Sequence, residues 1–105
     1  MTCVKFLLKG KSLCGFEIMG HSSVDGDDFD GKLVCAAISS AAYLTANTIT
    51  EIIGDKCDIH VDDALMYINV ENPSQNTVTV LKGLKLHLTE LSKQYNKRIK
   101  ITTEV

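Results

Sequence analysis

Hydrophobic and polar residues alternate with a period of two near the start of the chain, which is typical of half-buried strands. Apolar side chains fall on one side of each of two short segments, 2–9 and 13–20: Val4, Phe6, Leu8, Phe16 and Ile18. A Gly-Lys-Ser turn separates the segments, so we expect an antiparallel hairpin. Further strands are predicted at 57–61, 64–71 and 97–105, with a turn at 62–64.

Two longer segments have the three- and four-residue spacing of amphipathic helices. The first is predicted from about Lys32 to Ile53, with Asp30 as its N-cap and Gly54 as its C-terminal stop. Its expected buried stripe is Val34, Ile38, Ala41, Thr45, Thr48 and Ile52. The second helix begins in "NPSQ" at 72–75, and its expected stripe is Thr77, Leu81, Leu84, Leu88, Leu91 and Tyr95.

The predicted elements follow one another in the order ββαββαβ. This order favours an α+β fold, a two-layer sandwich in which two helices cover one face of a mainly antiparallel sheet. A chain of 105 residues has the usual size of one folding unit, and we expect a single domain over residues 1–105.

The net charge of −2 is unevenly distributed along the chain. Residues 17–63 carry ten acidic side chains and two lysines, a net charge of −8, whereas residues 82–100 carry six basic side chains and one acid, a net charge of +5. A dominant basic face is missing, so direct binding of nucleic acid is not expected.

Apolar runs in the sequence are short. None approaches the ~18 residues of a membrane-spanning helix, so no membrane association is expected. The run "VKFLL" near the start is interrupted by a lysine and is too short for a signal peptide. We therefore expect a cytoplasmic protein, in which the cysteines are reduced thiols.

Metal-binding motifs do not fit the sequence. The stretch "DGDDFDG" hints at a calcium loop, but aligning its glycine with Gly31 places Gly26 and Ala37 at the first and last ligand positions. Zinc-binding spacings are missing, and Cys57 and His60 are expected on opposite faces of a strand, with His60 in a structural role. We expect no metal and no cofactor, and we interpret Cys57, like Cys3 and Cys14, as a small buried hydrophobe.

Cys35 is the cysteine with a candidate chemical role. We expect it within the first turn or so of the first helix, where unsatisfied N–H groups and the helix dipole favour a thiolate. His21 ends the second strand, and the loop from Ser22 to Gly31 separates the two residues. The pattern is compatible with a catalytic Cys–His pair and also with a buried cysteine and an unrelated surface histidine.

The residues "GH" at 20–21 and "VCAAISS" at 34–40 resemble the ribosomal-processing cysteine protease (Prp) family. By position, the resemblance implies His21 as the general base and Cys35 as the nucleophile, with Gly20 and Ser39 in supporting roles. Lys32 stands where the family usually has an aspartate. Asp30 is close in sequence and is the expected substitute.

The resemblance implies a bacterial cytoplasmic cysteine endopeptidase that acts as a homodimer without a cofactor. Its substrate would be the N-terminal extension of a large-subunit ribosomal protein, which ends in an aromatic, apolar motif. The loop Ser22–Gly31 would then be a substrate-gated lid, whose aspartates either attract a basic partner or only keep a surface loop solvated. The alternative is a non-catalytic ribosome-associated binding module that uses its basic C-terminal region as the contact surface.

Overall fold

The computed structural model describes residues 1–21 and 28–104. Most of the predicted lid Ser22–Gly31 lies outside this description, as do residues 25–27 of the calcium-like stretch. The strands are β1 (Thr2–Lys9), β2 (Ser12–Met19), β3 (Cys57–Asp62), β4 (Leu65–Val70) and β5 (Ile99–Glu104). The helices are α1 (Phe29–Asn47), which continues into a π-helical segment η1 (Thr48–Ile53), and α2 (Gln75–Gln94).

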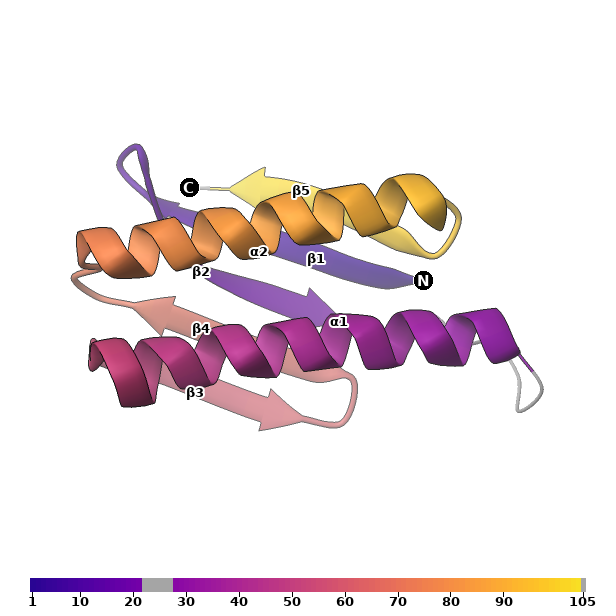
Figure 1. Ribbon diagram of the computed structural model, residues 1–105, viewed down its shortest axis with the longest axis horizontal. Helices are drawn as coiled ribbons and strands as arrows, with labels where there is room; N and C mark the ends of the chain where they lie inside the picture. Colours follow the sequence, from indigo (N-terminus) through magenta and orange to yellow (C-terminus); the bar gives the residue numbers. More distant parts are fainter. Residues whose placement is uncertain (22–27, 105) are drawn as a thin grey trace.

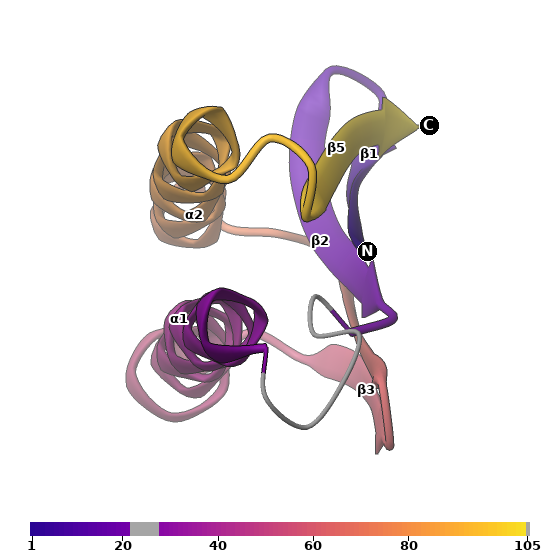
Figure 2. The same ribbon diagram turned by 90° about the vertical axis from the view of Figure 1, so that its right-hand side faces the viewer.

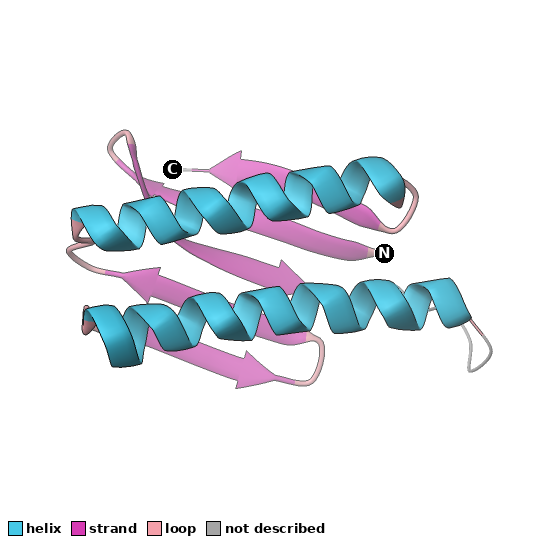
Figure 3. Cartoon of the chain, viewed as in Figure 1, coloured by secondary structure: helices cyan, strands magenta, loops and turns pink. Residues whose placement is uncertain are grey.

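The five described strands form one sheet in the order β3-β4-β2-β1-β5. The β1–β2 hairpin and the pairs β2–β4 and β3–β4 are antiparallel, and β5 pairs with β1 in parallel. Both helices lie on the same face of this sheet (Figures 1 and 2). The structure confirms the predicted α+β sandwich and its ββαββαβ order, which Figure 3 shows as a helical layer over a strand layer.

The core lies between the two layers and contains the side chains that the alternating pattern identified. Val4, Phe6, Phe16 and Ile18 are buried on the helix-facing side of the sheet. On α2, the expected stripe is confirmed: Thr77, Leu81, Leu84 and Leu88 are buried, and Leu91 and Tyr95 pack against them. Burial of these apolar surfaces supplies the main driving force for folding.

The cysteines predicted to be buried differ in their environments. Cys14 is buried, Cys57 is half-buried, and Cys3 is exposed. The prediction was wrong for Cys3 because its neighbours Thr2 and Val4 face the other way along β1 and occupy the buried positions.

Helix α1 begins earlier than the sequence predicted. Asp28 is the N-cap: its Oδ1 accepts a hydrogen bond of 3.1 Å from the backbone N–H of Gly31. Asp30, the predicted N-cap, is an exposed residue of the first turn. Asp28 also has a tertiary contact, since Arg98, just before β5, donates a hydrogen bond to its other carboxylate oxygen.

The second half of the first helix also departs from the predicted stripe. Ala42, Ala46 and Ile49 are buried, whereas Ile52 is 81% exposed. The wider turns of η1 change the angular position of Ile52 and account for its exposure. Ala42 and Ala46 precede η1 and lie next to the predicted positions Ala41 and Thr45, of which Thr45 is buried as predicted. Gly54 ends the segment at φ 85°, the left-handed conformation predicted for its stop.

The segment Phe29–Ile53 is long enough and apolar enough to cross a membrane, by length and composition alone. This corrects the expectation that no segment approaches that limit. Length and composition do not separate a membrane-spanning helix from a helix that packs in a protein core. Here Val34, Ile38 and Ala42 belong to the core between the helices and the sheet.

Candidate active site

A cavity of about 250 Å³ opens where β2 ends, beside α1 and the β3–β4 turn. Gly20 and His21 line it from the end of β2, and Cys35 and Ser39 line it from α1. Asp62, the last residue of β3, and Asp63, in the β3–β4 turn, also belong to its wall. In Figure 1, these three elements meet at the end of the molecule that holds the N-terminus. The fold thus brings four of the five predicted site residues into one cavity.

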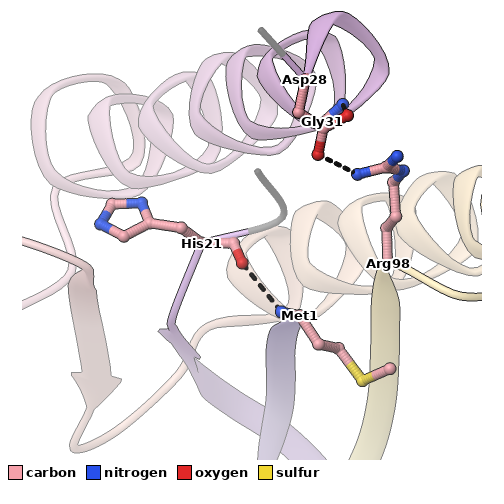
Figure 4. Close-up of polar contacts among 5 residues, drawn as sticks. All are labelled: Met1, His21, Asp28, Gly31 and Arg98. Carbon is pink, nitrogen blue, oxygen red and sulfur yellow. Dashed lines mark hydrogen bonds and ion pairs between the residues drawn. The ribbon is translucent and has the colours of Figure 1, made fainter. Parts of the chain in front are cut away.

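The backbone at Gly20 and His21 is held from two sides. The Gly20 N–H donates a 2.9 Å hydrogen bond to the carbonyl of Ala64, and the Met1 amine donates one of 2.9 Å to the carbonyl of His21 (Figure 4). Gly20 has φ +89°, and a Cβ there would lie 2.6 Å from the Met1 carbonyl oxygen. Glycine is therefore required at this position to bring His21 to the cavity.

The imidazole of His21 has a carboxylate neighbour that the sequence interpretation missed. His21 Nε2 lies 3.8 Å from Asp63 Oδ1, on the β3–β4 turn. From the sequence, Asp63 was only part of a turn. The signal was the strand pairing: Met19 of β2 lies opposite Leu65 of β4, so the residues beyond them converge. Local sequence patterns do not determine which strands pair, so the proximity of Asp63 to His21 could not be predicted from the sequence.

Cys35 lies deeper in the helix than predicted. It is the seventh residue of α1, about 9 Å along the helix axis from Phe29. The free N–H groups of a helix belong to its first turn, and the effect of the dipole fades beyond it. The helix start therefore neither activates this thiol nor supplies the oxyanion donors expected there. Activation of Cys35 has to come from side chains around the cavity.

Ser39 follows Cys35 by one helical turn and lines the same cavity. Its hydroxyl group can donate and accept hydrogen bonds. The same wall also carries apolar side chains, Ile38, Ala42 and Tyr43, and Val61 of β3 adds another. The cavity therefore combines a half-buried thiol, an imidazole and a hydroxyl with an apolar surface.

Asp30 and Lys32 are not among the described residues that line the cavity. Five positions along a helix rotate a side chain by about 140°, so Asp30 projects from a different side of α1 than Cys35. Both Asp30 and Lys32 are exposed. The structure thus leaves Asp30, the expected substitute for the missing aspartate, outside the cavity.

Two other cysteines are held in the protonated state by their surroundings. Burial is the largest cause that raises the pKa of the Cys14 thiol. Burial also raises the pKa of Cys57, and the negative charges of Asp55 and Asp58 raise it further. Both thiols are therefore poor nucleophiles at neutral pH, since the thiolate is the reactive form.

Metal ligation is not suggested by the described residues. Within 1–21 and 28–104, no three His, Cys, Asp or Glu side chains are grouped so that they could hold a metal ion. His60 is exposed on β3, where its ring lies 5.7 Å from that of its cross-strand neighbour Tyr67. The structural role proposed for His60 is thus limited to a surface ring contact.

Comparison with known proteins identifies relatives of this fold. The family model described as "Cysteine protease Prp" matches residues 1–100. No curated protein matches the sequence.

Solved structures of the same fold cover nearly the whole chain. A crystal structure of the ribosomal processing protease Prp from S. aureus with a substrate peptide has a TM-score of 0.86 at 18% identity, covering 99% of this chain and 100% of that one. The same protein with a covalently linked product peptide has a TM-score of 0.85 at 20% identity, with the same coverage. SMU.848 from Streptococcus mutans has a TM-score of 0.81 at 21% identity, covering 99% of this chain and 96% of that one.

Proposed function

Because the chain belongs to the cysteine protease Prp family, we propose that it is an endopeptidase whose nucleophile is Cys35 and whose general base is His21. The proposed substrate is the N-terminal extension of a large-subunit ribosomal protein. The S. aureus relative is a ribosomal processing protease seen with a substrate peptide, which supports this substrate class.

One observation carries the proposal: His21 and Cys35, from different elements, line the same cavity. A thiol is a weak nucleophile at its ordinary pKa and needs a neighbouring base to become reactive. Since Cys35 lies beyond the reach of the helix start, His21 is the group in the cavity wall suited to that role. Gly20 supports the pair by placing His21, and Ser39 supports it from the next turn of α1.

The first half of the reaction forms an acyl-enzyme. The imidazole of His21 takes the proton of the Cys35 thiol, and the thiolate attacks the carbonyl carbon of the scissile peptide bond. The C–N bond then breaks, and the imidazolium returns the proton to the departing amine. The products are a thioester on Cys35 and the new N-terminus of the second fragment.

The second half releases the first fragment. His21 takes a proton from a water molecule, and the hydroxide formed attacks the thioester carbonyl. The C–S bond breaks, Cys35 leaves as the thiolate and is reprotonated, and the fragment departs with a new carboxyl group. The hydroxyl of Ser39 is a candidate donor to the oxygen that becomes negative in both steps.

The apolar part of the cavity suits the aromatic, apolar motif expected at the end of the extension. Tyr43 and Val61 are exposed at its rim, and Ile38 and Ala42 lie in its wall. Aromatic and aliphatic side chains of a substrate would be removed from water on such a surface. We place the enzyme in the cytoplasm, where its substrate is made, and we propose that it is a homodimer like the family it belongs to.

The test is cleavage of a synthetic peptide that spans the junction between the extension and the mature ribosomal protein. Mass spectrometry is expected to show a single cut. Cys35→Ala should abolish the cut, and His21→Ala should lower kcat by about 10²- to 10⁴-fold. His60→Ala is the matched control, because it removes another exposed histidine that does not itself line the cavity. Full activity of Cys35→Ala would refute the proposed nucleophile.

The alternative function, a ribosome-associated binding module, has one supporting feature. Lys11, Lys82 and Lys85 border a shallow groove between α2 and the β1–β2 hairpin. Ribosome binding that persists in a protein unable to cut the peptide would favour this alternative. Family membership and the cavity favour the protease.

A further inference from the structure

We propose that Asp63 is a positioning residue that orients the imidazole of His21 toward Cys35. The inference rests on the proposed function, since it concerns the same pair. His21 Nε2 lies 3.8 Å from Asp63 Oδ1, an ion-pair distance rather than a hydrogen bond. A small movement of the exposed Asp63 side chain would bring its carboxylate within hydrogen-bond distance of Nε2, and Nδ1 would then be the nitrogen that takes the thiol proton. A carboxylate on one ring nitrogen fixes both the tautomer and the orientation of the ring.

The backbone connects the two residues closely. Gly20, which precedes His21, donates its N–H to the carbonyl of Ala64, which follows Asp63. Asp62 Oδ1 accepts a hydrogen bond of 2.7 Å from the N–H of Asp63, and Ala64 has φ +59°. The turn that carries Asp63 is therefore tied to the end of β2 that carries His21.

Asp63 supplies the acidic side chain beside His21 that α1 does not bring to the cavity. Asp30 projects from another side of α1, and Lys32 carries the wrong charge to accept a proton from an imidazole. Asp63 reaches the cavity from the β3–β4 turn instead, a segment 28 positions after Cys35 in the sequence. In this chain the acid of the site thus comes from a different element than the nucleophile.

The exposure of the two side chains and the charges around His21 determine how strongly Asp63 can influence the imidazole. The side chains of His21 and Asp63 are 54% and 96% exposed, and exposed ion pairs are weakened by water and salt. Asp62, Cys35 and Tyr43 also line the cavity, and the Met1 amine binds the His21 carbonyl. A bound peptide would exclude water from the cavity and strengthen the contact.

The first experiment compares Asp63→Asn, Asp63→Glu and the control Asp58→Asn, which removes an exposed acid from β3. Asp63→Asn is expected to lower kcat about fivefold, the upper range for an exposed ion pair, with little change in KM. Asp63→Glu should restore part of the loss.

The second experiment does not depend on cleavage. The rate at which iodoacetamide alkylates Cys35 is measured by peptide mapping in the unmodified protein, His21→Ala, Asp63→Asn and Asp58→Asn. The proposal expects slower alkylation in His21→Ala and in Asp63→Asn, and an unchanged rate in Asp58→Asn. An Asp63→Asn protein that equals the unmodified protein in alkylation would overturn the proposal. Failure of the unmodified protein to cut the peptide would overturn only the proposed function.

Discussion

Asp28 and Arg98 lie 70 positions apart in the sequence, and their side chains form an ion pair of 2.5 Å between Oδ2 and Nη1. Arg98 comes from the segment that leads into β5, and Asp28 caps the helix that carries Cys35 (Figure 4). The hydrogen bond to Asp28 raises the pKa of Arg98, so this partner is always charged. The contact ties the start of α1 to the far edge of the sheet.

We predict that Asp28→Ala lowers the free energy of unfolding by about 1 kcal/mol, the usual effect of losing an N-cap. Asp30→Ala is the control, since this exposed residue lies in the same turn without capping it. Urea unfolding followed by circular dichroism measures both. Equal stability losses in the two variants would contradict the assignment of Asp28 as the cap. Arg98→Gln should also lower the free energy of unfolding, because it removes the charged partner of Asp28.

Alkylation should distinguish the cysteines. We predict that Cys14 and Cys57 react more slowly with iodoacetamide than Cys35 at pH 7, because burial raises the pKa of both slow thiols. Mass spectrometry of peptides after timed quenching gives each rate. Exposed Cys3 serves as the internal reference, and His21→Ala should leave its rate unchanged. Reaction of Cys14 as fast as Cys35 would argue against this prediction.

Gly20→Ala is predicted to impair both stability and activity. Its φ of +89° is unfavourable for alanine, and the new Cβ would lie 2.6 Å from the Met1 carbonyl oxygen. Strain of this kind costs about 1–3 kcal/mol, and relief of it would displace His21. Gly10→Ala is the matched control, because Gly10 also has positive φ but meets nothing within 4 Å. Gly20→Ala should have a lower thermal unfolding temperature and a lower rate of peptide cleavage than Gly10→Ala.

The stability of the protein should depend on Asp55 in a pH-dependent way. Asp55 Oδ2 accepts hydrogen bonds from the Ser74 N–H, the Ser74 hydroxyl and the Thr77 hydroxyl, at the start of α2. These bonds, the one from Thr77 above all, lower the pKa of Asp55. A lowered folded-state pKa means that the carboxylate stabilises the fold fully above its unfolded pKa of about 4, and that this stabilisation is lost as pH falls through the folded value.

Asp55→Ala should therefore be less stable than the unmodified protein at pH 7, and the difference should shrink as pH falls below about 4. Urea midpoints at pH 7, 5 and 3 measure the trend. Asp58→Ala, which removes an exposed acid three positions away, controls for general charge effects. A stability difference that stays constant down to pH 3 would show that the hydrogen bonds to Asp55 do not depend on its charge.

Local sequence patterns predicted most of the helices and strands and the faces that they bury. Period-two alternation predicted the strands, and the leucine stripe of α2 predicted its buried face, because each pattern needs only one face of an element to be apolar. The pairing of Cys35 with His21 as candidate residues also came from the sequence, through family-like motifs at 20–21 and 34–40.

Tertiary contacts decided the rest. Asp28, rather than Asp30, caps α1 and pairs with the distant Arg98, and with this start of the helix Cys35 lies almost two turns into it. Ile52, which was predicted to be buried, is exposed because it lies in the π-helical segment η1. Asp63 reached His21 only because β4 pairs with β2. The sequence by itself determines which faces of its elements are apolar, since that depends on local periodicity. Which elements become neighbours depends on packing between distant segments, and only the tertiary structure decided it.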